Sequence, residues 1–154
     1  MRIAISNDHA GFSLKQPIAD RVRTLGHEVV DVGTVDDSPV DFPVMTRRVT
    51  ALVTAREVDR GLLVCGTGVG AAIAANKVRG IRAAVIHDTF VARQCVEHDD
   101  VNVACLGAWI IGPAIADDVI TVFLDAVFSA DPDFRRRVAQ LADIEAEAAA
   151  ASQP

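Results

Sequence analysis

Short apolar segments and amphipathic segments alternate along nearly the whole chain, and this alternation restricts the fold more than any other feature. The apolar segments predict strands at residues 2–6, 28–32, 61–64, 81–86 and 101–106. Helical spacing of apolar residues predicts helices at residues 12–25, 43–56, 69–76, 89–97 and 113–128. Short apolar strands separated by helices are typical of a parallel sheet covered on both faces. We therefore expect a three-layer αβα fold of the α/β class with a five-stranded parallel sheet.

The chain of 154 residues is long enough to bury a substantial core, and it contains no internal repeat or linker. We expect a single domain over residues 1–154. Residues 131–148 predict an extra amphipathic helix at the C-terminus. The alanine-rich residues 149–154 are expected to form a frayed tail.

The composition argues against several classes of protein. A net charge of −6 and the lack of a basic stripe with interleaved aromatics argue against nucleic-acid binding. Polar residues interrupt the N-terminal apolar stretch and the longer run at 101–116, so we expect neither a signal peptide nor a membrane span. The 3 cysteines lack metal-ligand spacing and suggest no disulfide framework. We expect a reducing, cytoplasmic environment and no metal.

The segment GLLVCGTGVGAAIAAN, residues 61–76, carries the strongest functional signal. An apolar strand delivers Cys65 onto a glycine-rich loop that opens directly into a helix. Gly66, Gly68 and Gly70 leave room for a ligand against the main chain, and the free amides of the first helical turn favour negative charge. The same field is expected to lower the pKa of Cys65. The loop thus combines a base or nucleophile with an oxyanion site.

Two other interpretations of this loop remain open. The glycines could mark only a tight turn, with Cys65 a small core residue. Alternatively, Gly66, Gly68 and Ala71 fit a permissive dinucleotide-binding spacing, with Asp88 after the next strand as the acid that binds a ribose. The dinucleotide hypothesis is weakened because the loop follows the third strand, whereas this motif usually follows the first, and because the chain has no room for a second substrate domain.

For a flavodoxin-like strand order of 2-1-3-4-5, the loop after the first strand faces the Cys65 loop. It contains Asp8 and His9, although Asp8 could simply cap a helix and leave His9 exposed. His98 and Asp99 precede the last strand, at the opposite edge of the sheet, so a second subunit, or a helix end that folds across, would be needed to bring them to Cys65. His98 could also be a polar residue that interacts with a helix C-terminus.

The remaining histidines and aspartates give weaker evidence for a functional role. His27 and His87 have no evident partner and are expected to be structural, and Asp36, Asp37 and Asp41 are expected in a solvated loop. A carboxylate, two imidazoles, a thiol and an oxyanion site together suit proton transfer next to a carbonyl. Such chemistry requires neither a metal nor an organic cofactor.

Several segments of the sequence resemble those of a known family. The segments NDHAGFSLK, DVGT, DFP, LLVCGTGVG, AANKVRGIRAA, EHDDVNV and LGAWIIG occur in the order found in type B ribose-5-phosphate isomerases and galactose-6-phosphate isomerase subunits. The resemblance extends to about residue 138. It implies a Rossmann-like αβα fold and a cofactor-independent aldose–ketose isomerase that acts on a sugar phosphate through an enediolate. It also implies a homodimer or a dimer of dimers with active sites shared between subunits.

The resemblance also implies roles for individual residues. Cys65 resembles the base that moves a proton between C1 and C2, and Thr67 assists it. His98 resembles the acid that opens the sugar ring. The loop amides resemble the enediolate-binding site, and Asp8 and His9 resemble a substrate-binding pair. Asp99 stands where the family has an asparagine. The loop residues with this binding role are Gly66, Gly68, Val69 and Gly70.

The sequence departs from the family at positions that bind the phosphate. Trp109 and Asp133 stand where arginines are common, and of three consecutive arginines only Arg137 clearly keeps its place. A charge-assisted hydrogen bond is worth about 1.5–3 kcal/mol, so losing two arginine partners would weaken phosphate binding by orders of magnitude. Either Arg135 or Arg136 compensates, or the substrate is not ribose 5-phosphate.

We therefore expect an isomerase of a tetrose, pentose or hexose phosphate. Two alternatives are an isomerase of an unphosphorylated sugar, for which Trp109 would provide a stacking surface, and a non-catalytic sugar- or nucleotide-binding module. A weaker third alternative is a nicotinamide-dependent oxidoreductase.

Overall fold

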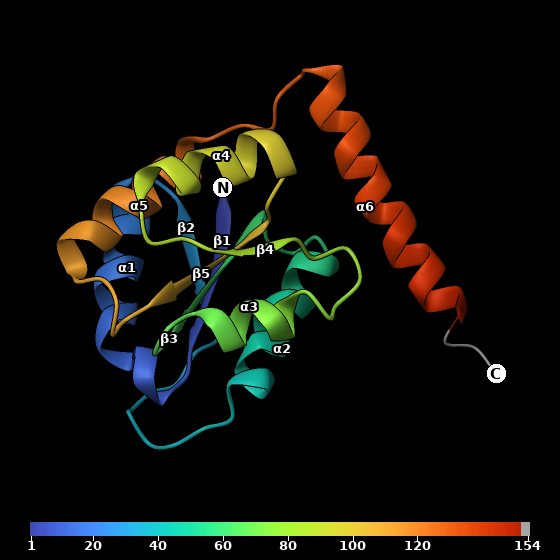
Figure 1. Ribbon diagram of the computed structural model, residues 1–154. Helices are drawn as coiled ribbons and strands as arrows, with labels where there is room; N and C mark the ends of the chain where they lie inside the picture. Colours follow the sequence, from blue (N-terminus) through green and yellow to red (C-terminus); the bar gives the residue numbers. More distant parts are fainter. Residues whose placement is uncertain (152–154) are drawn as a thin grey trace.

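The computed structural model describes residues 1–151 and contains a central sheet with helices on both faces (Figure 1). All strand pairs are parallel, and the spatial order is β2-β1-β3-β5-β4. The predicted α/β class and five-stranded parallel sheet are therefore confirmed. The strands are β1 Arg2–Asn7, β2 Glu28–Asp31, β3 Arg60–Cys65, β4 Ala83–Val85 and β5 Val103–Gly107.

The predicted order of the last two strands was wrong. Strand β5 lies between β3 and β4 instead of at the edge of the sheet. All residues of β5 are buried, whereas the three residues of β4 are only half-buried. A strand inside a parallel sheet is covered on both faces, so the longer and more completely apolar strand takes the inner position. The switch point between β1 and β3 is unaffected, because these two strands are neighbours as expected.

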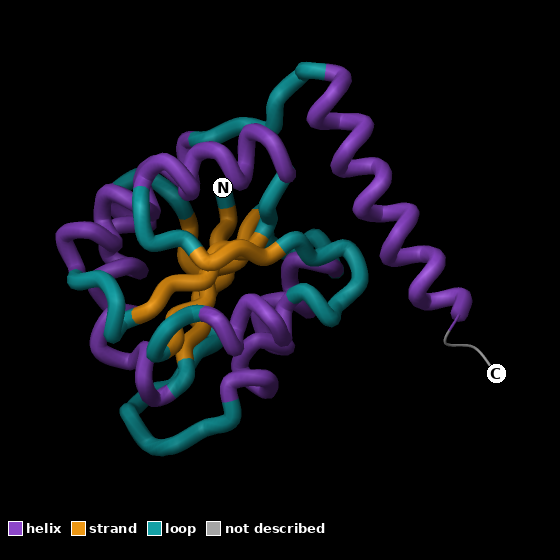
Figure 2. The backbone as a smooth tube through the Cα atoms, viewed as in Figure 1, coloured by secondary structure: helices purple, strands orange, loops and turns teal. Residues whose placement is uncertain are grey.

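Helices on the two faces of the sheet form the outer layers (Figure 2). Helices α1, α4 and α5 cover one face, and α2 and α3 cover the other. Every predicted helix is present; its first residue is within one residue of the prediction, and its last residue is displaced by one to three residues. The helical segments are η1 His9–Gly11, α1 Phe12–Thr24, α2 Phe42–Thr54, α3 Val69–Ala75, α4 Thr89–Asp99, α5 Pro113–Asp125 and α6 Pro132–Ala151.

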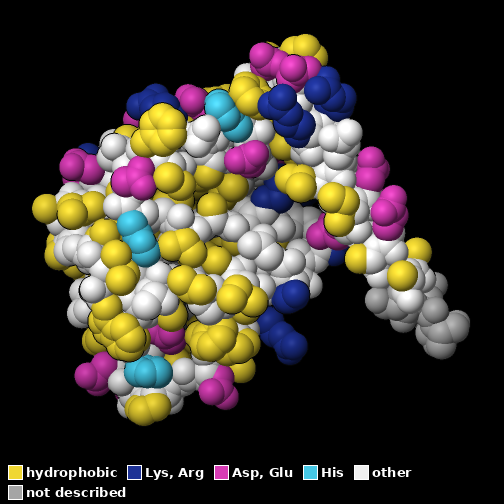
Figure 3. Space-filling model, in the orientation of Figure 1, with side chains coloured by type: hydrophobic (Ala, Val, Ile, Leu, Met, Phe, Trp, Pro, Cys, Tyr) yellow, Lys and Arg dark blue, Asp and Glu magenta, His cyan; other side chains and the backbone are white. Residues whose placement is uncertain are grey.

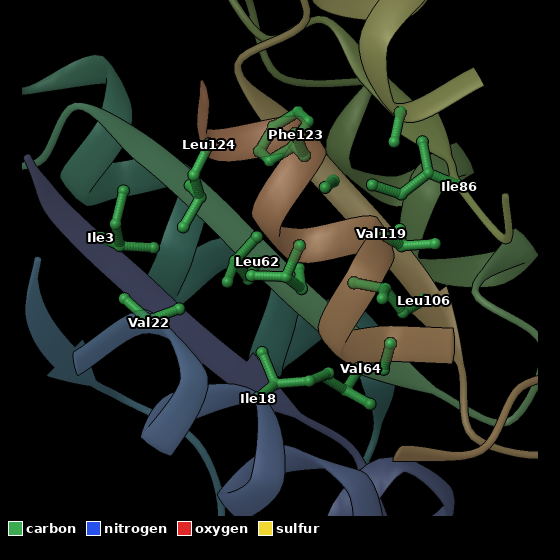
Figure 4. Packing of buried hydrophobic residues seen from close by; sticks show 14 of the residues in the cluster. Ile3, Ile18, Val22, Leu62, Val64, Ile86, Leu106, Val119, Phe123 and Leu124 are labelled. Atoms are coloured by element: carbon green, nitrogen blue, oxygen red, sulfur yellow. The ribbon is translucent and has the colours of Figure 1, made fainter. Parts of the chain in front are cut away.

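Alternate residues of the strands divide the core into two parts. In β3, Leu62 and Val64 pack with α1 and α5, whereas Leu63 belongs to the cluster under α2 and α3. Figure 4 shows the first of these clusters, in which Phe123 and Val119 of α5 lie over the strands. The rigid sheet therefore holds the loops that follow its strands in fixed positions.

Helix α6 lies beside the body of the protein and contains no buried residue (Figure 1). It is joined to the body by Phe134, which stacks on His98, and by the Glu145 carboxylate, which accepts a 3.0 Å hydrogen bond from the Gly80 amide. The predicted end at residue 148 was too early, because the helix continues through Ala151. The rest of the predicted frayed tail, residues 152–154, lies outside the described residues. Within residues 1–151, we find no helix whose length and apolar character would allow it to span a membrane.

Candidate active site

The loop after β1 lies directly against the end of β3. In the sheet register Asn7 is opposite Val64, and the amide of Asp8 donates a 3.1 Å hydrogen bond to the Val64 carbonyl. Gly11 is equally close, because a Cβ atom on it would lie 2.1 Å from the same carbonyl oxygen. Only glycine fits there without moving the chain, so the segment NDHAG is held next to Cys65.

Asp8 combines two roles that the sequence presented as alternatives. Its buried carboxylate accepts a 3.0 Å hydrogen bond from the Gly11 amide and so caps the short helix η1. The same carboxylate interacts with the thiol of Cys65. The predicted proximity of these two loops is confirmed.

A buried polar network behind Asp8 fixes the loop and was missed by the sequence analysis. The Asn7 side chain donates to Thr34 Oγ1 at 2.7 Å and accepts from the Thr34 amide at 3.0 Å. Lys15 Nζ donates to the Thr34 carbonyl at 2.7 Å and forms an ion pair with Asp31 at 2.9 Å. The loops after β1 and β2 are therefore locked together.

Cys65 ends β3 and lies half-buried under the glycine-rich loop. Gly68, with φ of 78°, is in the left-handed region and forms the N-cap of α3. Burial, together with the hydrogen bond and negative charge of Asp8, raises the pKa of Cys65, and the amides of Gly68 and Thr67 offset this only in part. The predicted lowering of the Cys65 pKa was therefore wrong, because desolvation and a neighbouring carboxylate outweigh the helix terminus.

Trp109 lies over the glycine-rich loop. The backbone amide of Trp109 donates to the Gly66 carbonyl at 2.9 Å. The amide of the preceding residue, Ala108, donates to the Cys65 carbonyl at 2.8 Å. The indole ring is so close to Gly66 that a Cβ atom there would lie 2.8 Å from it. Since 73% of Trp109 is nevertheless exposed, part of the side chain remains open to solvent.

His87 supports the same loop from the other side of β5. Its Nε2 atom accepts a 2.9 Å hydrogen bond from the amide of Gly107, the residue paired with Cys65 in the sheet. Burial lowers the pKa of His87, which favours the neutral ring that this bond requires. The sequence identified no partner for His87 or His27. The structure gives each a backbone partner, since His27 Nδ1 lies 3.3 Å from the N-terminal amine of Met1, and these contacts fit the structural role expected of both residues.

A cavity of about 440 Å³ opens beside His9. Its lining includes Asp41 and Arg48, so Asp41 belongs to the surroundings of the candidate site and not only to a solvated loop. The amide of Val40 lies 3.4 Å from His9 Nδ1 and orients the imidazole. The sequence offered no signal for Arg48, because its position depends on how α2 packs.

His98 and Asp99 lie far from this loop. They form the last turn of α4, which leads into the beginning of β5, whereas Cys65 lies at the carboxyl edge of the sheet. The ring of His98 stacks on Phe134 of α6, with 3.9 Å between ring centroids. As predicted, one chain does not bring His98 to Cys65.

The two candidate arginines of α6 lie on the His98 side. The Arg136 guanidinium is paired with Asp133 at 2.5 Å, and Arg137 lies over the Phe134 ring at 5.7 Å from its centroid. The candidate residues thus form two groups. The thiol-loop group contains Asp8, His9, Cys65, Gly66, Thr67, Gly68, Val69, Gly70 and Trp109, and the His98 group contains His98, Asp99, Phe134, Arg136 and Arg137.

Comparison with known proteins identifies the family of this chain. The sequence model of the family described as Ribose/Galactose Isomerase matches residues 3–141. The chain belongs to the ribose/galactose isomerase family. Ribose-5-phosphate isomerase B of Escherichia coli is 39% identical over 127 residues, which cover 82% of this chain and 85% of that protein.

Other members of the ribose/galactose isomerase family extend the comparison. D-erythrulose-4-phosphate isomerase of Pectobacterium atrosepticum is 38% identical over 130 residues, covering 83% of this chain and 85% of that protein. The solved structure of ribose-5-phosphate isomerase B from Clostridium thermocellum superposes with a TM-score of 0.92 at 41% identity, covering 96% of this chain and 99% of that one. The suspected resemblance is therefore confirmed.

The hypothesis of a dinucleotide-binding site loses the acid that was expected to bind the ribose. Asp88, which would have bound a ribose, instead accepts a 2.8 Å hydrogen bond from the Val91 amide and caps α4. Within residues 1–151, no three His, Cys, Asp or Glu side chains gather in a group that could hold a metal ion.

Proposed function

We propose that this protein is a cofactor-independent isomerase that interconverts the aldose and ketose forms of a small sugar phosphate. The observation that carries the proposal is the position of the Cys65 thiol, between the Asp8 carboxylate and the amides that open α3. A base and an anion-stabilising group thus meet at one point. Membership of the ribose/galactose isomerase family supports the same chemistry.

The reaction can be written with residues of the thiol-loop group. The Cys65 thiolate removes the proton from C2 of the open-chain aldose, and the electron pair moves onto the carbonyl oxygen to give an enediolate. Amides of the glycine-rich loop stabilise this oxyanion, which is the role of preorganised donors in such reactions. The Thr67 hydroxyl relays a proton between O2 and O1. The Cys65 thiol then returns its proton to C1, which produces the ketose and regenerates the thiolate.

The raised pKa of Cys65 suits this cycle. The thiolate and the enediolate are never present together, because transfer of one proton converts the first anion into the second. A thiolate that is destabilised by burial and by Asp8 is a stronger base than a fully solvated one. Partial desolvation therefore helps the step that removes a proton from carbon.

We further propose that the active site is completed by a second subunit in a homodimer or a dimer of dimers. The His98 group lies at the other edge of the sheet from Cys65, so the ring-opening acid and the α6 arginines would come from the partner. Helix α6 also projects from the body without burying a residue (Figure 3), and its Leu141 and Ile144 are exposed. Exposed apolar side chains of this kind favour a protein interface.

The substrate is proposed to be a phosphate other than ribose 5-phosphate. Arg136 is neutralised by Asp133 at 2.5 Å, so Arg137 remains the stronger candidate for a phosphate ligand, with His9 on the other subunit. The similarity to an enzyme named for erythrulose 4-phosphate supports a tetrose phosphate as a candidate substrate. Free thiols at all three cysteines support a cytoplasmic setting.

A screen of isomerisation tests this proposal. Tetrose, pentose and hexose phosphates are each assayed beside the corresponding free sugars, with Cys65→Ala as the inactive control. We expect turnover of at least one phosphate other than ribose 5-phosphate. Activity only on free sugars would favour the alternative suggested by the exposed Trp109 ring. Binding without turnover would favour a non-catalytic module.

A further inference from the structure

The turn that follows His98 has an unusual backbone. Asp100 caps α4 in the left-handed region, with φ of 50°, which is uncommon for a residue other than glycine. Its amide bonds back to the carbonyls of Cys95 and Val96, so the last turn of α4 closes on itself. The carbonyls of the final residues of this helix therefore need other partners.

Arg82 supplies those partners from the segment before β4. Its Nε atom lies 3.2 Å from the Asp99 carbonyl and 2.7 Å from the Asp100 carbonyl. Its Nη2 atom donates to the Asp100 carboxylate at 2.6 Å. One guanidinium thus binds two backbone carbonyls and a side chain of a single turn, which only the forked shape of arginine allows.

Asn102 ties the same two segments together through its amide group. Its Oδ1 accepts from the Arg82 amide at 2.9 Å, and its Nδ2 donates to the Gly80 carbonyl at 2.9 Å. The backbone N–H of Asn102 also donates to the Arg82 carbonyl at 3.0 Å. The backbone that carries the Arg82 side chain is therefore itself fixed relative to the turn.

The His98 side chain has a second constraint in addition to this turn. Its ring stacks on Phe134 at an interplanar angle of 15°. The stack constrains the plane of the imidazole, whereas the Arg82 contacts constrain the helix end from which the side chain extends. The Arg82 side chain is only 28% exposed, so its hydrogen bonds are partly protected from water.

We infer that Arg82 is a positioning residue for His98. It does not touch the substrate; it fixes the turn at Asp99 and Asp100 so that the imidazole of His98 meets the ring oxygen of a cyclic sugar phosphate. This inference rests on the proposed function, in which His98 opens the sugar ring. Displacing a catalytic group by about 1 Å can reduce a rate by about 10².

The test compares a substrate that forms a ring with one that cannot. An aldopentose 5-phosphate closes a furanose ring through O4, whereas an aldotetrose 4-phosphate carries its phosphate on O4 and stays open. The variants are Arg82→Gln and Arg82→Lys, which keeps the charge without the fork. Arg93→Gln is the matched control, because Arg93 is an exposed arginine on α4 whose nearest ion pair, with Glu97, is a loose 3.9 Å contact.

We expect kcat for the pentose phosphate to fall about 10- to 100-fold in both Arg82 variants, with less than about threefold change for the tetrose phosphate. The Arg93→Gln variant should match the wild type on both. Equal losses on the two substrates would show a merely structural role, and unchanged kcat on both would show no role. Either result overturns the inference while leaving the proposed function intact.

A second measurement is independent of turnover. The ring-proton resonances of His98 are compared by NMR in the full-length wild type, Arg82→Gln and Arg93→Gln. We expect them to move in Arg82→Gln and to stay in place in Arg93→Gln, with the resonances of His27 constant throughout. If the wild type turns over neither sugar phosphate, the result counts against the proposed function alone. If the His98 resonances do not move in Arg82→Gln, the positioning role is overturned whatever the turnover.

Discussion

Cys65 and His98 lie at opposite edges of the same sheet. Cys65 is the last residue of β3, whereas His98 lies in the last turn of α4, which leads into the beginning of β5. The strands between them are rigid and buried, so no local movement within one chain can join the two groups. In the proposed dimer, the His98 of each subunit would act with the Cys65 of the other.

Subunit complementation is the first prediction. General acid–base groups contribute about 10²–10⁴-fold, so Cys65→Ala and His98→Ala should each be nearly inactive alone on a sugar phosphate that must be opened from its ring form. Coexpression of the two should restore about one quarter of wild-type activity, because half of the dimers are hybrids and each hybrid has one intact site. A fully active monomer, identified by light scattering, would exclude shared sites.

The second prediction concerns pH. Because burial and Asp8 raise the pKa of Cys65, activity should increase as the pH rises through that pKa. Asp8→Asn removes a negative charge that disfavours the thiolate, so the rising limb should move to lower pH. Asn can still accept the Gly11 hydrogen bond, and Asp88→Asn, at the cap of α4, serves as control. A pH–rate profile that is identical in Asp8→Asn would rule out this origin of the raised pKa.

Labelling provides a check on the identity of this thiol. Cys65 is half-buried, while Cys95 and Cys105 are buried and burial raises the pKa of Cys95 to about 11. Iodoacetamide, which reacts with thiolates, should therefore modify Cys65 first. Mass spectrometry of tryptic peptides would reveal the order, and faster labelling of Cys95 would contradict it.

The third prediction concerns the phosphate ligand. Arg137→Ala should raise KM strongly with a smaller change in kcat, as expected when uniform binding is lost. Asp133→Asn should lower KM, because it releases Arg136 from its ion pair. Arg23→Ala, an exposed arginine with the same type of pair to Asp20, is the control. If the substrate is a free sugar, Arg137→Ala should have little effect and Trp109→Ala should weaken binding instead.

Stability provides the fourth prediction. A methyl group on Gly11 would lie 2.1 Å from the Val64 carbonyl oxygen, so Gly11→Ala must displace the loop that carries Asp8. Overpacking of this kind costs about 1–3 kcal/mol of unfolding free energy. Gly112→Ala is the matched control, because a Cβ atom there meets nothing within 4 Å. Equal midpoints of urea unfolding in the two variants would refute the steric argument.

Much of the fold was predictable because it depends on local patterns. Strand-length apolar segments and helical spacing specified every strand and every α-helix, although not the short 3₁₀ helix η1, and the meeting of the Asp8 and Cys65 loops followed from the position of parallel strand ends at one edge. The order of β4 and β5 was not predictable in the same way. Both are short apolar strands, and their relative burial is decided by the packing of the whole sheet.

The sequence by itself determined the chemical groups: a thiol on a glycine-rich loop, a carboxylate beside it, and a histidine on the other side of the sheet. Tertiary structure alone decided their properties. The pKa of Cys65 is raised because desolvation and the charge of Asp8 depend on three-dimensional distance. The partners of His87, Arg48 and Arg82 likewise lie on other segments of the chain. Residue identity is local, whereas burial and charge proximity exist only in the folded molecule.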